Sequence, residues 1–294
     1  MTAELTDGDL PGLFRDADRA SVRGQRLTVL LNAVRLYGAG AAALGGALSW
    51  KLGFFDVWGG VALVGFAAAL AAEVMLVIHQ PERDWYSGRA LAESAKTLGW
   101  RYAVAAEPFA EDVPAKEARR ILRERLVEIA EKGKDRVTLS SDEAVITPRM
   151  AELRESPFAE RKAAYLRGRV QDQKDWYVRN AEKNKRRALG WRVLLIVGEV
   201  LAVALASGRA FGVWDLDVSG VLAAAVAGSA AWFGLKQHTA LASAYSVTAA
   251  ELSLTRSRIV DTDEAEWAAA VADVEGAISR EHTLWLASRS GAAH

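Results

Sequence analysis

Three charged residues lie inside stretches that are otherwise apolar. Glu199 stands in "RVLLIVGEVLAVALASGR" and is the only charge between the two bounding arginines. Arg35 interrupts the apolar stretch 27–50, and Glu73 lies near the end of the stretch 57–78. A charge within a membrane span is costly and usually faces protein or a water-filled cavity. We therefore take Glu73, Glu199 and Arg35 as candidate intramembrane polar or gating residues.

Two roles for Glu199 are consistent with the sequence. Arg192 precedes Glu199 by seven residues and Ala206 follows it by seven, which places all three on one helical face. That face could line the axis of an oligomer, with Glu199 contributing a polar ring. Alternatively, a protonated or hydrogen-bonded Glu199 holds neighbouring helices together. In both cases Glu199→Ala is expected to change conductance or assembly without preventing membrane insertion.

Residues that support enzyme chemistry are absent or scattered. The chain has no cysteine, which excludes disulfides, thiolate metal sites and thiol nucleophiles. The four histidines lack metal-ligand spacing, and no order of Ser, His and Asp indicates a nucleophilic site. The glycine-rich stretch "YGAGAAALGG" has no preceding strand, so it does not predict a dinucleotide loop. We predict that the protein is not an enzyme and has no catalytic residue, metal or cofactor.

Four apolar segments must position the charged residues. They are residues 27–50, 57–78, 193–208 and 218–235. At about 1.5 Å per residue they extend about 24 to 36 Å, against about 30 Å for the hydrocarbon core of a bilayer. We predict four membrane spans; the alternative is a soluble bundle that buries the same segments.

Small residues within these segments recur every four positions. This spacing lets membrane helices approach closely. The residues are Gly38, Ala42 and Gly46 in the first segment, and Gly220, Ala224 and Gly228 in the fourth.

Positive charge is distributed unevenly about these segments. The loops inside the two segment pairs carry only Lys51 and Arg209, whereas arginine and lysine are abundant outside the pairs. The positive-inside rule then predicts that both termini and the central region are cytoplasmic. We predict a multi-pass protein of the inner (plasma) membrane, whose basic residues face anionic lipid headgroups and not nucleic acid. The equal numbers of basic and acidic residues, 37 each, indicate no particular partner.

The two segment pairs resemble each other. An offset of 157 residues relates similar positions without a gap: Arg35 and Arg192, Phe54 and Phe211, Gln80 and Gln237. The same offset places Ala42 at the position of Glu199, so Glu199 belongs to one repeat only. The sequence therefore predicts an internal duplication of a two-helix unit, with both copies entering the membrane from the cytoplasm.

Segments outside the spans are predicted to be helical. Residues 84–102 continue the second span, residues 115–132 have one apolar face, and residues 158–192 form one long helix leading into the third span. Residues 133–148 allow a small hairpin or an irregular loop. One side of the long helix either packs on its neighbours or offers a surface to a partner or ligand. Its residues are Arg161, Tyr165, Arg169, Gln173, Trp176, Tyr177, Asn180 and Asn184.

The C-terminal stretch "EAEWAAAVADVEGAISREHTLWLAS" predicts an amphipathic helix. We expect it to fold back on the helix that extends the fourth span. Its apolar face carries Trp267, Val271, Val274, Ile278 and Trp285.

Several of these stretches resemble one family. "ITPRMAELRESPFAERKAAYLRGRVQDQKDWYVRNAEKN" is similar to the opening of SMODS- and SLOG-associating two-transmembrane effector (SLATT) domains, and "VADVEGAISREHTLW" to their end. "LFRDADRASVRGQ" and "QPERDWYSGRALAESAKTLGWRY" resemble a second subfamily. The positions that carry the resemblance are Ile146, Thr147, Met150, Arg154, Arg161, Tyr165, Arg169, Gln173, Trp176, Tyr177, Ala181, Asn184, Glu275, Ile278, Glu281 and Trp285, and in the first half Phe14, Ala17, Asp18, Ser21 and Gln25.

The resemblance implies two tandem two-span units, residues 8–156 and 157–290. It also implies a membrane effector of a prokaryotic defence system, which a sensor protein or a nucleotide-signalling partner triggers. We therefore expect an all-α integral membrane protein in which two transmembrane hairpins extend as long helices into a cytoplasmic helical region. The expected function is an oligomeric pore-forming or membrane-perturbing effector. The alternatives are a non-conducting membrane scaffold that recruits a cytoplasmic partner and a soluble helical interaction protein.

Overall fold

The chain is helical almost throughout, as the sequence predicts. The computed structural model describes residues 5–48, 50–135, 137, 144–213 and 219–290, with the side chains of 219 and 279–290 outside that description. The chain divides into two compact units. Unit 1 comprises Met1–Gln25, Pro81–Tyr177 and Val247–His294, and unit 2 comprises Arg26–Gln80 and Val178–Ser246.

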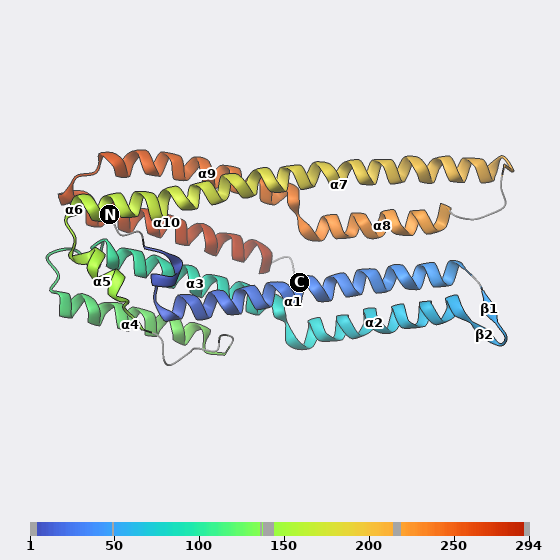
Figure 1. Cartoon of the computed structure of the whole chain (residues 1–294), viewed down its shortest axis with the longest axis horizontal. Coiled ribbons are helices and arrows are strands. Elements are labelled where there is room, and N and C mark those ends of the chain that lie inside the picture. The colour runs from blue at the N-terminus through green and yellow to red at the C-terminus, as the bar shows by residue number, and fades with distance from the viewer. Residues whose placement is uncertain (1–4, 49, 136, 138–143, 214–218, 291–294) are drawn as a thin grey trace. The chain divides into compact units, whose positions relative to one another are not determined.

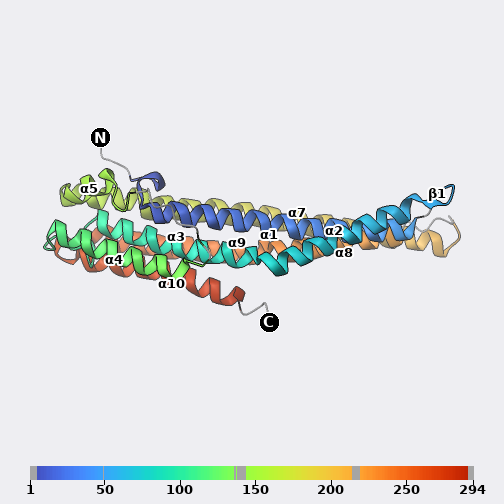
Figure 2. The same cartoon turned by 90° about the horizontal axis from the view of Figure 1, so that it is seen from below.

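Unit 2 contains the helices of both hairpins that the sequence predicts. In the first, α1 and α2 lie side by side in both views (Figures 1 and 2). The helices that contribute to this unit are α1 (Gly12–Ala47), α2 (Val57–His79), α7 (Asp172–Ala210), α8 (Ser219–Lys236) and α9 (His238–Asp261), of which α1, α7 and α9 also contribute to unit 1.

A two-stranded antiparallel ribbon closes the first hairpin, and the sequence did not predict it. β1 (Lys51–Leu52) pairs with β2 (Phe55–Asp56). Gly53 has φ 65°, a left-handed conformation that glycine adopts without steric cost, and this allows the tight turn. The Asp56 side chain then accepts a hydrogen bond from the Trp58 backbone N–H at 3.1 Å and caps α2.

Glycines allow close approach of α1 and α2. A Cβ on Gly38 would lie 2.7 Å from the carbonyl oxygen of Gly65, and one on Gly65 would lie 2.5 Å from that of Gly38. Gly38 and Ala42 are buried, as the small-residue spacing predicts. The third position was wrong: Gly45 packs against α2, whereas Gly46 has nothing within 4 Å. The buried positions Gly38, Ala42 and Gly45 are spaced by four and then by three residues, because a straight helix has about 3.6 residues per turn.

Three helices among the described residues are long and apolar enough to cross a membrane. They are α1, α2 and the continuous helix Phe158–Ala210. α8 is apolar but shorter, and its 18 residues extend about 27 Å at about 1.5 Å per residue. The fourth span therefore stays a prediction, as does the cytoplasmic orientation.

The two repeats share a backbone feature at their related glutamines. Gln80 has φ 45° and Gln237 has φ 48°, and each separates two helices in the chain. Each donates its backbone N–H to the carbonyl four residues earlier, at 3.1 Å to Leu76 and 3.2 Å to Phe233. Left-handed backbone is uncommon for a residue other than glycine, so its occurrence at both positions supports the predicted duplication.

Unit 1 is built around α3, which packs against α4, α5 and α10. The predicted apolar face of residues 115–132 is confirmed, since Leu122 and Leu126 of α4 are buried. The elements of this unit are η1 (Asp7–Asp9), α3 (Pro81–Ala103), α4 (Ala115–Gly133), α5 (Pro148–Glu155), α6 (Phe158–Tyr165), the π-helix η2 (Leu166–Gln171) and α10 (Glu264–Ser290), with parts of α1, α7 and α9. Residues 136 and 138–143, in the middle of the stretch predicted as a hairpin or loop, lie outside the described residues.

The predicted long helix is continuous but not uniform. It runs from Phe158 to Ala210 and includes the π-helical turn η2 after Tyr165. Such turns are rare and frequently mark functional sites. The sequence did not predict this turn.

Candidate functional site

Arg35 and Glu73 form an ion pair within the first hairpin. An Nη1 of Arg35 donates to Oε2 of Glu73 at 2.8 Å, and Nη2 donates to Oδ1 of Asn32 at 3.0 Å. The Arg35 and Glu73 side chains are 47% and 50% exposed. Pairing lowers the cost of placing each charge in an apolar setting. The sequence singled out both residues but did not pair them, although each lies 19 residues from Phe54 in the turn between the two helices.

Glu199 differs from this pair because it faces outward. It is exposed on α7 and has no hydrogen bond or ion pair with any residue that the structure describes. α7 packs toward α8 through the neighbouring Gly198, where an added Cβ would lie 2.7 Å from Cγ2 of Val226. Arg192 and Ala206, on the same side as Glu199, are also exposed. The chain thus presents this line of residues to its surroundings.

A buried ionic network lies within unit 1. Arg169 is 1% exposed. Its guanidinium donates two hydrogen bonds to the Glu275 carboxylate, from Nε to Oε1 at 2.9 Å and from Nη2 to Oε2 at 2.8 Å. The same Nη2 donates to Oε1 of Glu93 at 2.8 Å, and Nη1 donates to Gln173 at 2.7 Å. Bidentate charge-assisted hydrogen bonds of this kind are stronger than neutral ones. The network joins the π-helix η2, α3 and α10.

Two hydroxyl groups also donate hydrogen bonds to the Glu275 carboxylate. The Tyr165 hydroxyl donates to Oε1 at 2.9 Å, and the Thr97 hydroxyl donates to Oε2 at 2.9 Å. Burial and the charge of Glu275 raise the pKa of Tyr165 well above its ordinary value, so the phenol stays a neutral donor. Burial lowers the pKa of Arg169, but the charges of Glu275 and Glu93 raise it by more. The guanidinium is therefore charged.

Sequence reasoning missed Glu93 and Thr97. They are four residues apart on α3, on the face that also carries the buried Trp100. Polar residues on a buried helical face are the signal that could have found them, because buried polar groups require partners.

Arg154 holds the segment that follows α3. Its guanidinium donates to the carbonyl oxygens of Tyr102 and Phe109 at 3.2 and 2.5 Å, and to those of Ala110 and Val113 at 3.2 and 3.4 Å. Burial lowers the pKa of Arg154. Arg154 thus binds backbone carbonyls at the end of α3 and in the segment that connects α3 to α4.

Other residues of the predicted helix side have different surroundings. Arg161 is 4% exposed and donates to Glu111 at 2.5 Å. Tyr177 is buried, and the neighbouring Trp176 is 40% exposed. Asn184 lies in unit 2, where its Oδ1 is 2.7 Å from Nδ1 of His238. The structure thus divides the predicted set between two units.

The C-terminal helix packs on a different element from the one expected. We expected it to fold against the extension of the fourth span, but α10 packs mainly on α3. Trp267 explains part of this, because its indole N–H donates to the carbonyl of Val104 at 2.8 Å. Ile278 is buried as predicted. The Trp285 side chain lies outside the described residues.

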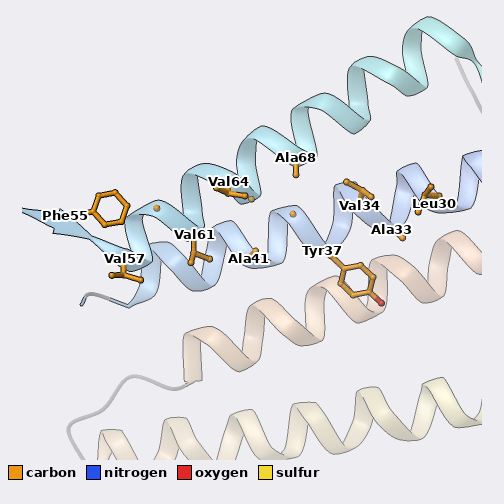
Figure 3. Close-up of a pocket in the computed structure, with 13 residues that line it drawn as sticks. Leu30, Ala33, Val34, Tyr37, Ala41, Phe55, Val57, Val61, Val64 and Ala68 are labelled. Atoms are coloured by element: carbon orange, nitrogen blue, oxygen red, sulfur yellow. The ribbon is translucent and has the colours of Figure 1, made fainter. Parts of the chain in front are cut away.

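An apolar groove of about 830 Å³ lies between α1 and α2. Figure 3 shows Val34 and Leu30 of α1 and Val64 and Ala68 of α2 along it. Tyr37 supplies the only side-chain polar group among its lining residues. The groove suits hydrocarbon, which needs no polar partner. Within the described part of the chain, no group of three or more His, Asp or Glu could hold a metal ion.

Comparison with protein families gives two matches. Residues 11–162 match SMODS and SLOG-associating 2TM effector domain 3, and residues 165–285 match SMODS and SLOG-associating 2TM effector domain 1. No curated protein and no solved structure matches the chain. The buried network crosses the boundary between the matches, since Glu93 belongs to the first segment and Arg169 to the second.

The two matches and the three apolar helices give one consistent description. The matched families are two-transmembrane effector domains, which are associated with conflict and defence systems, and the apolar helices have the length that such domains need. The chain therefore belongs to the SMODS- and SLOG-associating two-transmembrane effector family, of which it carries two tandem domains, one in each half.

Proposed function

We propose that the protein is an oligomeric effector of a prokaryotic defence system that forms a pore or otherwise perturbs the inner membrane when a separate sensor triggers it. Its membership of an effector family supports the general class. One observation supports the pore mechanism in particular: Glu199 is an exposed carboxylate, without a partner among the described residues, on an apolar helix long enough to cross a membrane.

A carboxylate in that position needs surroundings other than lipid. Charged groups in spans almost always face protein or water, because hydrocarbon does not solvate them. The neighbouring Val200 and Val203 are 62% and 67% exposed and suit contact with lipid or with another helix. A second copy of the chain would cover Glu199, and a ring of such copies would place it on a water-filled axis. Arg35 and Glu73 neutralise each other and fit a role within the hairpin.

We further propose that both termini and unit 1 are cytoplasmic and that α8 is the fourth span. The basic residues outside the hairpins support this orientation. The sensor, or a nucleotide signal, would then act on unit 1. Because one helix runs without a break from Phe158 to Ala210, a displacement at Arg169 would be passed to the span that carries Glu199.

The test is ion flux through the purified full-length chain in liposomes, together with membrane potential in cells that express the chain with its trigger. Flux and depolarisation are expected. Glu199→Ala should alter conductance or oligomeric state while the protein still floats with membranes. Val203→Ala is the matched control, because it changes an exposed residue of the same helix without changing charge. Normal membrane potential at high expression with the trigger supplied would count against the pore.

A second candidate is a non-conducting scaffold that recruits a cytoplasmic partner. One observation favours it: Val247 and Leu254, seven residues apart on α9 and outside the predicted spans, are 56% and 72% exposed. Such a face could bind another helix. A stable partner recovered with the full chain and lost with Leu254→Asp, in the absence of any conductance, would favour the scaffold.

A further inference from the structure

Three cations gather around residues 236–239, where α8 ends and α9 begins. Arg187 of α7 acts electrostatically on both Lys236 and His238. Arg192 donates from Nη2 to Oγ1 of Thr239 at 3.3 Å. We call Arg187, Arg192 and Lys236 the cation cluster.

The cation cluster has no carboxylate partner within the described part of the chain. Arg187 and Arg192 are exposed and make no ion pair there. Lys236 is half-buried, and its Nζ lies 4.7 Å from the centre of the Trp232 ring. The positive charge of Arg187 lies near that of Lys236. Like charges held together in this way repel one another, and an anion would relieve that repulsion.

Comparison of the two repeats shows that the second lacks the carboxylate that pairs with the arginine in the first. The offset of 157 residues relates Arg192 to Arg35, whose charge Glu73 neutralises at 2.8 Å. The same offset relates Glu73 to Ala230. The second hairpin therefore keeps the arginine and lacks the carboxylate, and it adds Arg187 and Lys236. The positive charges of the second hairpin can therefore be neutralised by an anion that does not belong to the chain.

We propose that the cation cluster binds a phosphate group. Phosphate suits the cluster because arginine presents a fork of donors to its oxygens and lysine adds a compact charge. Hydrogen bonding holds the polar residues on either side of it in place. Asn184 donates from Nδ2 to the carbonyl of Asn180 at 2.8 Å, and its Oδ1 accepts from Nδ1 of His238 at 2.7 Å.

Two sources can supply this phosphate: the headgroup of an anionic phospholipid and a free phosphate in solution. The lipid source rests on the membrane orientation proposed above, which puts the end of α8 at the cytoplasmic surface. The free source does not. A single set of variants tests both.

For the lipid source, the full chain is reconstituted in nanodiscs of phosphatidylcholine with a minority of phosphatidylglycerol, and retained phosphatidylglycerol is counted by native mass spectrometry. Arg192→Ala and Lys236→Ala should each weaken retention about fivefold, the factor for one cation near an anionic surface. Ala230→Glu should weaken it similarly by restoring the carboxylate of the first repeat. Lys185→Ala, an exposed cation outside the cluster on the same helix, should have no such effect.

For the free source, inorganic phosphate is titrated into the protein in a maltoside detergent, which carries no phosphate group, and thermal stabilisation is measured. Stabilisation that Arg192→Ala abolishes and Lys185→Ala retains identifies free phosphate as the ligand. If neither assay distinguishes Arg192→Ala from Lys185→Ala, or if Ala230→Glu changes neither, there is no phosphate site. Flotation of each variant and its ion flux separate this result from failure of the proposed function.

Discussion

Replacement of Glu275 by alanine should destabilise unit 1 specifically. Glu275 is fully buried and accepts four hydrogen bonds, two from Arg169 and one each from Tyr165 and Thr97. Removing one partner of a buried ion pair costs about 3–5 kcal/mol. Glu93 still accepts from Arg169 at 2.8 Å in the variant, which places the expected loss near the lower end, about 3 kcal/mol.

The measurement is hydrogen exchange of backbone amides in the full chain. A loss of about 3 kcal/mol should accelerate exchange about 100-fold at amides of α3 and α10 that open only when unit 1 unfolds. Amides of α2, in unit 2, serve as an internal reference and should not change. Glu275→Gln preserves shape and one acceptor oxygen, so its effect should be smaller.

The matched control is Asp273→Ala, which removes an exposed carboxylate from the same helix. Its expected effect on stability is within about 0.5 kcal/mol. If Glu275→Ala and Asp273→Ala accelerate exchange equally, the buried network does not hold α10 on α3.

Three further predictions concern unit 2 and the helix contacts. Gly38→Ala should separate α1 from α2, because its Cβ would lie 2.7 Å from the carbonyl oxygen of Gly65, and cross-linking between cysteines introduced on the two helices should fall. Gly40→Ala is the control, because its Cβ would have nothing within 4 Å. Equal cross-linking in the two variants would contradict the packing. Arg35→Ala should lower thermal stability more than the double replacement of Arg35 and Glu73 by alanine, because the single change leaves a lone carboxylate; additive losses would exclude coupling. Burial, with the nearby charges of Arg187 and Lys236, lowers the pKa of His238 below its ordinary 6.5. The unfolded chain therefore binds the proton first, and unit 2 should lose stability as pH falls below about 6.5, by an amount that His238→Gln removes in a thermal melt.

The apolar segments and their lengths follow from the sequence because hydropathy is a local property. Residues 57–78 predict a span, and α2 runs from Val57 to His79. The repeat was also visible, since the offset of 157 pairs Gln80 with Gln237 and both adopt the same left-handed backbone. The family resemblance also singled out Arg169 and Glu275, but not their pairing.

Tertiary structure decided which of these residues meet. Arg35 and Glu73 pair because α1 and α2 cross closely at Gly38 and Gly65, and no local pattern fixes that register. Glu93 lies 76 residues from Arg169 and 182 from Glu275 in the chain, yet one buried network holds all three. Periodicity within a segment depends on a few neighbours, whereas pairing between segments depends on how whole helices pack. The sequence by itself therefore determined the helices and the family, and only the folded chain decided which charges are paired, which are buried and which, like Glu199, face outward.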